Sequence, residues 1–152
     1  PYAAFATGLE YVIVELAKAM VRDGEGASHL IEITVEGARS VEEARRVAMS
    51  IAKSPLVKTA VYGGDANWGR VACAAGYSGV AMDPDAVRIW LGDLEVYRCG
   101  NPQPFDEARA AEILARDEVP LAVDLQAGKD TVTVWTCDLT HRYVDINAHY
   151  RT

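Results

Sequence analysis

Two neighbouring stretches decide the fold: His29–Glu36, with the sequence HLIEITVE, and Ser40–Glu43, with the sequence SVEE. The first predicts a strand, because it is β-rich and its apolar and polar side chains alternate in part. The second is typical of a capping box, in which the Ser40 hydroxyl accepts a hydrogen bond from a free amide while Glu43 reaches back. A helix is therefore expected after the strand, ending near Lys53.

Apolar residues recur at helical spacing within this second element and are expected to face the core. They are Val41, Ala44, Val47, Ala48 and Ile51. Ser54-Pro55 is expected to end the helix, because proline disfavours helical backbone in the residue before it. The β-rich run Leu56–Tyr62 then predicts a strand.

An amphipathic helix is predicted before the strand, over Phe5–Arg22. Its apolar residues fall three and four apart and form one stripe: Leu9, Val12, Leu16 and Met20. Gly24 lies where a C-capping glycine is expected.

The rest of the chain predicts a helix, a hairpin, a helix and a second hairpin. The helix begins at Asp65 or Asn67 and runs through Val71 and Ala75 towards Tyr77, and the hairpin joins Val87–Leu91 to Leu94–Tyr97 around Gly92-Asp93. The next helix is Asp106–Arg116, and the last hairpin joins Leu121–Leu125 to Thr131–Thr136. The tail His141–Thr152 lacks clear periodicity. This order predicts one α+β domain over residues 1–152, with helices packed on an antiparallel or mixed sheet.

Composition excludes several classes of protein. The chain has 152 residues, 50% hydrophobic and 24% charged, as in folded soluble proteins. Its net charge of −7 argues against a nucleic-acid binder, and no apolar run approaches the roughly 18 residues of a membrane span. Three widely spaced cysteines favour a reducing, cytoplasmic setting. A start at Pro1 favours a processed product or a fragment.

The segment Asp23–Ala27, with the sequence DGEGA, is the first candidate site. Glycines on both sides of Glu25 allow a ligand to approach closely and leave the carboxylate free for a substrate ammonium. Taken alone, the segment is more simply interpreted as a helix stop followed by a solvated turn.

The double-glycine turn Gly63-Gly64-Asp65 is the second candidate. A strand, a glycine turn and a helix start can present amides to an anion, with Asp65, Asn67 and Arg70 nearby. The alternative is that Asp65 and Asn67 cap the helix, Trp68 packs, and Arg70 pairs with a carboxylate. The two interpretations are evenly balanced.

The cysteines and histidines do not predict a metal site, because they do not combine at a zinc-ligand spacing. Buried structural thiols and surface imidazoles are expected instead. These residues are Cys73, Cys99, Cys137, His29, His141 and His149.

Three separated motifs resemble the ornithine acetyltransferase (bifunctional glutamate N-acetyltransferase) family of arginine biosynthesis. They are Val21–Ala27 (VRDGEGA), Ser54–Ala60 (SPLVKTA) leading into Asp65–Arg70 (DANWGR), and the ending Cys137–Thr152. The resemblance covers nearly the whole chain, which is similar to the C-terminal part of the family's β chain. It implies the family's layered αββα-type fold.

The family's activity follows as an implication of the resemblance. A precursor cuts itself into an α and a β chain, and the new N-terminal Thr of the β chain takes acetyl from N-acetylornithine and passes it to glutamate. The freed amine can serve as the base, and α-chain donors form the oxyanion hole. An (αβ)2 assembly is implied, in the cytoplasm or in the mitochondrial matrix of a eukaryote. No cofactor is implied, although some members accept acetyl-CoA.

The resemblance assigns substrate-binding roles to Glu25, Asn147 and Thr152. Glu25 would hold the substrate ammonium or assist proton movement, and the other two would close the amino-acid pocket, so the tail is expected to dock. No segment resembles the family's nucleophile setting. Ala6-Thr7 is superficially similar to the cleavage site, but Thr7 lies too close to Glu25. The catalytic Thr is thus expected upstream and the isolated chain inactive. A non-catalytic assembly module and a related self-processing aminopeptidase remain as alternatives.

Overall fold

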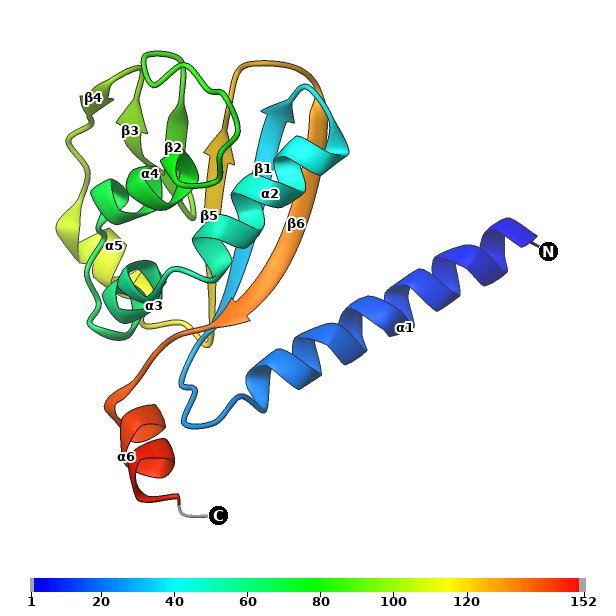
Figure 1. Ribbon diagram of the computed structural model, residues 1–152, viewed down its shortest axis with the longest axis vertical. Helices are drawn as coiled ribbons and strands as arrows, with labels where there is room; N and C mark the ends of the chain where they lie inside the picture. The colour runs from blue at the N-terminus through cyan, green and yellow to red at the C-terminus, as the bar shows by residue number, and fades with distance from the viewer. Residues whose placement is uncertain (1, 151–152) are drawn as a thin grey trace.

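The strand β1 (Leu30–Ala38) lies inside the sheet, between two strands from the last third of the chain. The computed structural model describes residues 2–150 (Figure 1). In this part of the chain, β1 pairs in parallel with β5 (Glu118–Asp124) and antiparallel with β6 (Asp130–Cys137). The six-stranded sheet has the order β4-β3-β2-β5-β1-β6, with β2 at Arg88–Leu91, β3 at Leu94–Arg98 and β4 at Asn101–Pro102. The sheet is mixed, as predicted.

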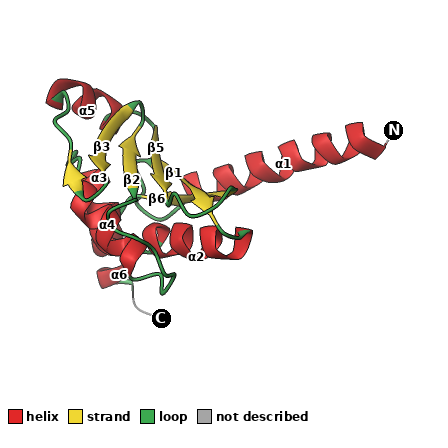
Figure 2. Cartoon of the chain, turned by 90° about the horizontal axis from the view of Figure 1, so that it is seen from above, coloured by secondary structure: helices red, strands yellow, loops and turns green. Residues whose placement is uncertain are grey.

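Helices α2, α3 and α4 pack with one face of this sheet into a shared apolar core. Figure 2 shows α2 and α4 on the same side of the strands, whereas α5 lies near β3, away from α2. Residues of α5 join the same core cluster. The helices are α2 (Val41–Ala52), α3 (Pro55–Tyr62), α4 (Trp68–Gly76) and α5 (Glu107–Leu114).

Predicted caps begin three of these helices. The Ser40 hydroxyl accepts from the Glu43 amide at 3.2 Å, Asn67 caps α4, and Asp106 caps α5. The predicted inward face of α2 is confirmed at Ala44, Val47, Ala48 and Ile51. Val41 was wrongly included, because it is 58% exposed in the first turn of α2.

The prediction of a strand over Leu56–Tyr62 is wrong, because this segment is α3. The Ser54 hydroxyl accepts from the Val57 amide at 3.4 Å, and Pro55 occupies the first turn, where its missing N–H costs no hydrogen bond. Ser54-Pro55 therefore ends one helix and begins the next. Val57 and Val61 are buried, so core packing outweighs the strand preference of their β-branched side chains.

The first predicted hairpin is confirmed as β2 and β3, with Gly92 at φ +58° in the turn. The second is wrong: β5 and β6 follow each other in the chain, but β1 lies between them in the sheet. The connection after Leu125 crosses over the end of β1, where the Ala127 and Gly128 amides donate to the Gly37 carbonyl at 2.7 Å. A local turn signal cannot reveal this inserted strand.

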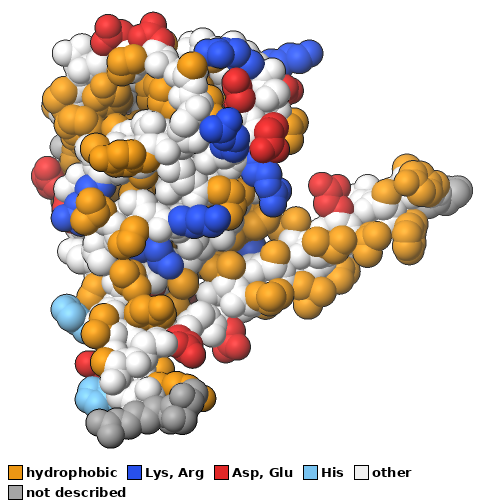
Figure 3. All heavy atoms as spheres, viewed as in Figure 1, with side chains coloured by type: hydrophobic (Ala, Val, Ile, Leu, Met, Phe, Trp, Pro, Cys, Tyr) orange, Lys and Arg blue, Asp and Glu red, His pale blue; other side chains and the backbone are white. Residues whose placement is uncertain are grey.

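Helix α1 (Tyr2–Arg22) extends away from the sheet (Figure 1), and none of its residues is buried in the described structure. Its C-terminal half is attached by Lys18, whose Nζ lies 2.8 Å from Glu118 Oε1 and 3.1 Å from Glu32 Oε2. The predicted apolar stripe, Leu9, Val12, Leu16 and Met20, is exposed. Figure 3 shows hydrophobic side chains, in orange, along this extended helix. Within residues 2–150, no helix is long and apolar enough to cross a membrane.

Helix α6 (His141–His149) occupies most of the tail for which the sequence predicted no element. None of its residues is buried, and nine residues are too few for an apolar spacing to recur over several helical turns. Thr140 caps its first turn by accepting from the Tyr143 amide at 3.3 Å. The helix is held against the turn between α1 and β1, near the start of α3 (Figure 1).

Candidate functional site

The turn Asp23–Ala27 is packed against the C-terminal segment of the chain. A Cβ on Gly24 would lie 3.0 Å from Cys137 Sγ, and a Cβ on Gly26 would lie 2.7 Å from the Tyr143 amide nitrogen. Gly26, at φ +69°, is the left-handed residue, whereas the sequence had assigned the helix-ending role to Gly24. The two glycines therefore permit the close approach of the chain's own tail to Glu25.

Glu25 and Asn147 meet across this contact. Asn147 Nδ2 donates to Glu25 Oε2 at 2.8 Å and to the Tyr143 carbonyl at 2.9 Å. Both side chains are exposed, so the second carboxylate oxygen of Glu25 is open to a ligand. The structure brings two of the three predicted substrate-binding residues together, and Thr152 lies outside the described residues.

A concave surface surrounds Glu25 and is formed by three parts of the chain. It is lined by Gly24, Glu25, Lys53, Pro55, Lys58, Cys137, Asp138, Leu139 and Tyr143. Lys53 and Lys58, on either side of the α2–α3 junction, add positive charge to the same concave surface as the Glu25 carboxylate. A pocket with charges of both signs suits an amino acid, which carries an ammonium and a carboxylate.

Sequence reasoning missed Lys53 and Lys58 as site residues. Both lie beside the Ser-Pro pair that joins α2 to α3, and Lys58 belongs to the SPLVKTA motif. Their place on the same surface as Glu25 depends on how α2 and α3 pack near the turn, so the only available signal was the motif itself.

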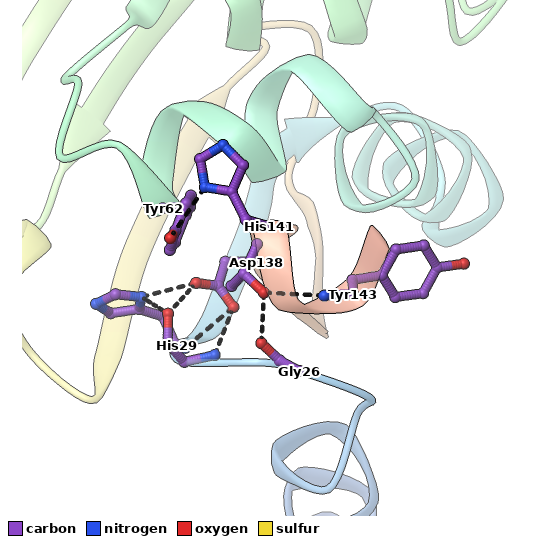
Figure 4. Close-up of polar contacts among 8 residues, drawn as sticks. Gly26, His29, Tyr62, Asp138, His141 and Tyr143 are labelled. Carbon is purple, nitrogen blue, oxygen red and sulfur yellow. Dashed lines mark hydrogen bonds and ion pairs between the residues drawn. The ribbon is translucent and has the colours of Figure 1, made fainter. Parts of the chain in front are cut away.

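Asp138 fixes the end of β6 to the segment that precedes β1 (Figure 4). Its Oδ1 accepts from the Ser28 amide at 2.8 Å and from the His29 amide at 3.1 Å, and His29 Nδ1 lies 2.9 Å from Oδ2. Burial raises the pKa of the Asp138 carboxyl, but the hydrogen bonds from Ser28 and His29 outweigh burial and lower that pKa overall. A buried, ionised carboxylate thus holds the base of the candidate site together.

His141 attaches the start of α6 to α3. Its Nδ1 lies 3.3 Å from the Tyr62 hydroxyl, and the two rings meet edge to face with centroids 5.6 Å apart (Figure 4). The sequence did not predict this contact, because Tyr62 and His141 lie 79 positions apart.

Comparison with known proteins identifies the family. The ArgJ family model matches residues 1–152, which is the whole chain. The chain belongs to the ArgJ family. It is 53% identical over 151 residues to the arginine biosynthesis bifunctional protein ArgJ of Symbiobacterium thermophilum, covering 99% of this chain and 38% of that relative. The ArgJ of Oceanobacillus iheyensis is 46% identical over 151 residues, with 99% and 37% covered.

The fold is likewise that of the ArgJ family. The crystal structure of ArgJ from Bacillus halodurans superposes with a TM-score of 0.95 at 45% identity, covering 98% of this chain and 70% of that chain. The predicted α+β layered fold is thereby confirmed. The present chain spans less than two-fifths of the length of the curated ArgJ relatives that it matches.

In this ArgJ-family chain the double-glycine turn ends α3 and does not present its amides to a ligand. The Gly64 amide donates to the Val61 carbonyl at 3.1 Å, and the Asp65 amide donates to the Ala60 carbonyl at 2.9 Å. This pair of hydrogen bonds, with Gly64 at φ +66°, is the Schellman motif that ends a helix. The hydrogen bonds therefore favour the capping interpretation of this turn over an anion-binding one.

The capping interpretation also describes the residues after the turn. Asn67 caps α4, and Trp68 stacks on Tyr97 with ring centroids 4.9 Å apart. Arg70 differs from its predicted role: it donates to the Leu56 carbonyl at 3.1 Å instead of pairing with a carboxylate. It joins α4 to the first turn of α3.

The cysteines are more accessible than the sequence indicated. Cys73 and Cys99 are exposed and Cys137 is partly buried, so the expectation of three buried thiols was wrong. Cys73 lies on the outer side of the short helix α4, whose buried face consists of other residues. Over residues 2–150, no group of three His, Cys, Asp or Glu side chains is arranged to hold a metal ion.

Proposed function

We propose that this chain is the C-terminal part of the β chain of an ornithine acetyltransferase, or glutamate N-acetyltransferase. The reaction moves acetyl from N-acetylornithine to glutamate, giving ornithine and N-acetylglutamate, in the cytoplasm. The observation that carries the proposal is the 2.8 Å contact between Glu25 and Asn147 in a chain 53% identical to a bifunctional ArgJ.

This chain's contribution is the amino-acid pocket. The exposed Glu25 carboxylate holds the substrate ammonium or assists proton movement, and the amide of Asn147 fixes the direction of that carboxylate. Asn147 and Thr152 close the pocket on the side of the tail. Lys53 and Lys58 supply positive charge for the carboxylate groups of the substrates.

The acetyl group is carried by a threonine on another segment of the β chain. That threonine is the N-terminal residue created by self-cleavage, so its own α-amine acts as base for its hydroxyl. Donors from the α chain stabilise the tetrahedral intermediate. The assembled protein needs no cofactor, and acetyl-CoA is an alternative acetyl donor. The isolated 152-residue chain is inactive.

Helix α1 supports the proposal that other chain segments complete the protein. Its exposed stripe, Leu9, Val12, Leu16 and Met20, lies on a helix that contacts the rest of the described chain only near its C-terminal end. Exposed contiguous apolar surface of this kind marks an interface. The upstream β-chain segment and the α chain of an (αβ)2 assembly cover the stripe.

The test is acetyl exchange by the assembled full-length protein. Incubation with N-acetylornithine and glutamate is expected to give equal amounts of ornithine and N-acetylglutamate, with an acetylated threonine peptide after a quench. Glu25→Gln is expected to lower kcat/KM at least about tenfold, whereas Glu42→Gln, an exposed glutamate of α2, leaves it unchanged.

Each alternative gives a different result in the same assay. Release of free amino acids from peptides without acetyl exchange would identify an aminopeptidase. Absence of both activities, with substrates still bound, would identify a non-catalytic binding module. Either result would overturn the proposal.

A further inference from the structure

We propose that Thr140 is a positioning residue that sets the distance between Glu25 and Asn147. This inference rests on the proposed function of those two residues. Thr140 is only 6% exposed and does not line the concave surface around Glu25, so it acts through its neighbours.

One hydroxyl joins the two parts of the site. Thr140 Oγ1 donates to the Gly26 carbonyl at 2.6 Å and accepts from the Tyr143 amide at 3.3 Å. Both bonds are drawn in Figure 4. The same hydroxyl therefore donates its proton to the glycine turn and accepts a hydrogen bond from α6 with a lone pair.

Each bond of Thr140 lies next to one functional residue. Gly26 directly follows Glu25, so its carbonyl belongs to the turn that carries the carboxylate. Tyr143 is one helical turn before Asn147, and its carbonyl accepts from Asn147 Nδ2 at 2.9 Å. The path Glu25–Gly26–Thr140–Tyr143–Asn147 closes on itself through the 2.8 Å bond between its two ends. A change at Thr140 is thus transmitted to both sides of the pocket.

Few other contacts hold α6 in this place. The helix has no buried residue, so apolar packing contributes little to its position. At its start the helix is also held by the 3.3 Å contact between His141 and Tyr62, and just before it the Leu139 amide donates to the Lys58 carbonyl at 3.4 Å. Asp138, two residues before Thr140, fixes Ser28 and His29 and so brings the chain to the correct starting point. Thr140 then determines where the helix begins relative to Gly26.

The discriminating variants are Thr140→Val and Thr140→Ser in the assembled full-length protein. Valine keeps the branched shape but leaves the Gly26 carbonyl without its donor and α6 without its cap. We expect Thr140→Val to raise KM for both N-acetylornithine and glutamate about tenfold, with kcat changed less than about threefold. Thr140→Ser keeps the hydroxyl and is expected to restore KM to within about twofold.

Two comparisons separate positioning from a general loss of structure. Thr131→Val, at an exposed threonine of β6, is expected to leave KM unchanged. Combining Thr140→Val with Asn147→Ala is expected to raise KM no further than Asn147→Ala alone, because both changes disable the same pair. A merely structural role would lower the fraction of active protein and leave the KM of the remainder unchanged.

Unchanged KM in Thr140→Val, failure of serine to restore it, or additive effects with Asn147→Ala would each overturn the inference while the acetyltransferase activity stands. Loss of the proposed function itself has a different signature, since the wild-type protein would then show no acetyl exchange. In that case both the proposed function and the role of Thr140 would be wrong.

Discussion

Asn147, near the end of α6, donates a hydrogen bond of 2.8 Å to the carboxylate of Glu25, although 122 positions separate the two residues. The contact joins the first turn of the described chain to its last helix. Glu25 and Tyr143, the residue one helical turn before Asn147, line the concave surface that also contains Lys53 and Lys58. The tail is thereby part of the candidate amino-acid pocket.

Gly26→Ala is expected to displace α6 and weaken substrate binding. The new Cβ would lie 2.7 Å from the Tyr143 amide nitrogen, at a backbone φ of +69°. Gly64→Ala is a matched control, because Gly64 has φ +66° and no atom within 4 Å of the new Cβ. The control is expected to cost about 1 kcal/mol from backbone strain alone.

Chemical denaturation and substrate kinetics of the two variants test this difference. Gly26→Ala is expected to cost at least about 1 kcal/mol more than Gly64→Ala and to raise KM, because overpacking adds to the strain. Equal losses of stability with unchanged KM in both variants would show that α6 does not depend on the close contact.

Asp138→Asn is expected to destabilise the assembled protein by about 2 kcal/mol at pH 7, since the buried amide cannot accept all the hydrogen bonds from Ser28 and His29. The pKa of the Asp138 carboxyl is below its ordinary value of 3.8 in the folded chain. Its ionisation therefore stabilises the fold fully above that value, and the contribution is lost as pH falls through the folded pKa.

Urea midpoints measured between pH 7 and pH 3 check the sign of this effect. The difference between the wild type and Asp138→Asn is expected to be constant down to about pH 5 and to shrink below about pH 4. A difference that grows on acidification would contradict the assignment. Asp130→Asn, at the other end of β6, serves as the control for a general acid effect.

Leu16→Glu is expected to prevent assembly of the full-length protein, because it places a charge in the exposed apolar stripe of α1. The neighbouring Glu15→Gln removes a charge and is expected to leave assembly intact. Analytical ultracentrifugation of both variants measures the result. A fully assembled, active Leu16→Glu protein would show that the stripe faces solvent in the complex.

Ser54→Ala is expected to destabilise the protein by about 1 kcal/mol, because the hydroxyl accepts from the Val57 amide at the start of α3. Chemical denaturation measures the loss. Ser78 offers a comparison, since its hydroxyl accepts from the Val80 amide at 3.2 Å outside any helix start. A smaller loss for Ser54→Ala than for Ser78→Ala would contradict the capping role.

Local signals in the sequence predicted much of the fold. Ser40, Asn67 and Asp106 cap the helices expected from them, because an N-cap depends on residues only two or three positions away. The same local reasoning failed at Leu56–Tyr62, where strand propensity was outweighed by the Ser54 cap and burial of two valines. It failed again at β5 and β6, whose order in the sheet depends on β1, far away in sequence.

The candidate site was predictable only in part. The motif resemblance identified Glu25 and Asn147, which the structure places in contact. Asp138 and Thr140 belong to the motif at the end of the chain, but their contacts were not predictable because their partners lie more than 100 positions away. The sequence predicts that the glycines around Glu25 allow a ligand to approach closely. In the structure, the side chain of Cys137 and the backbone of α6 lie against them instead.

The central claim is that Glu25 and Asn147 act as one unit in an amino-acid pocket for acetyl transfer. A double-mutant cycle with Glu25→Gln and Asn147→Ala, measured by acetyl exchange of the assembled full-length protein, tests it most directly. Each single change is expected to lower kcat/KM about tenfold or more, and the double change to add little to the larger single effect. Independent, fully additive effects, or acetyl exchange unchanged by either substitution, would contradict the claim.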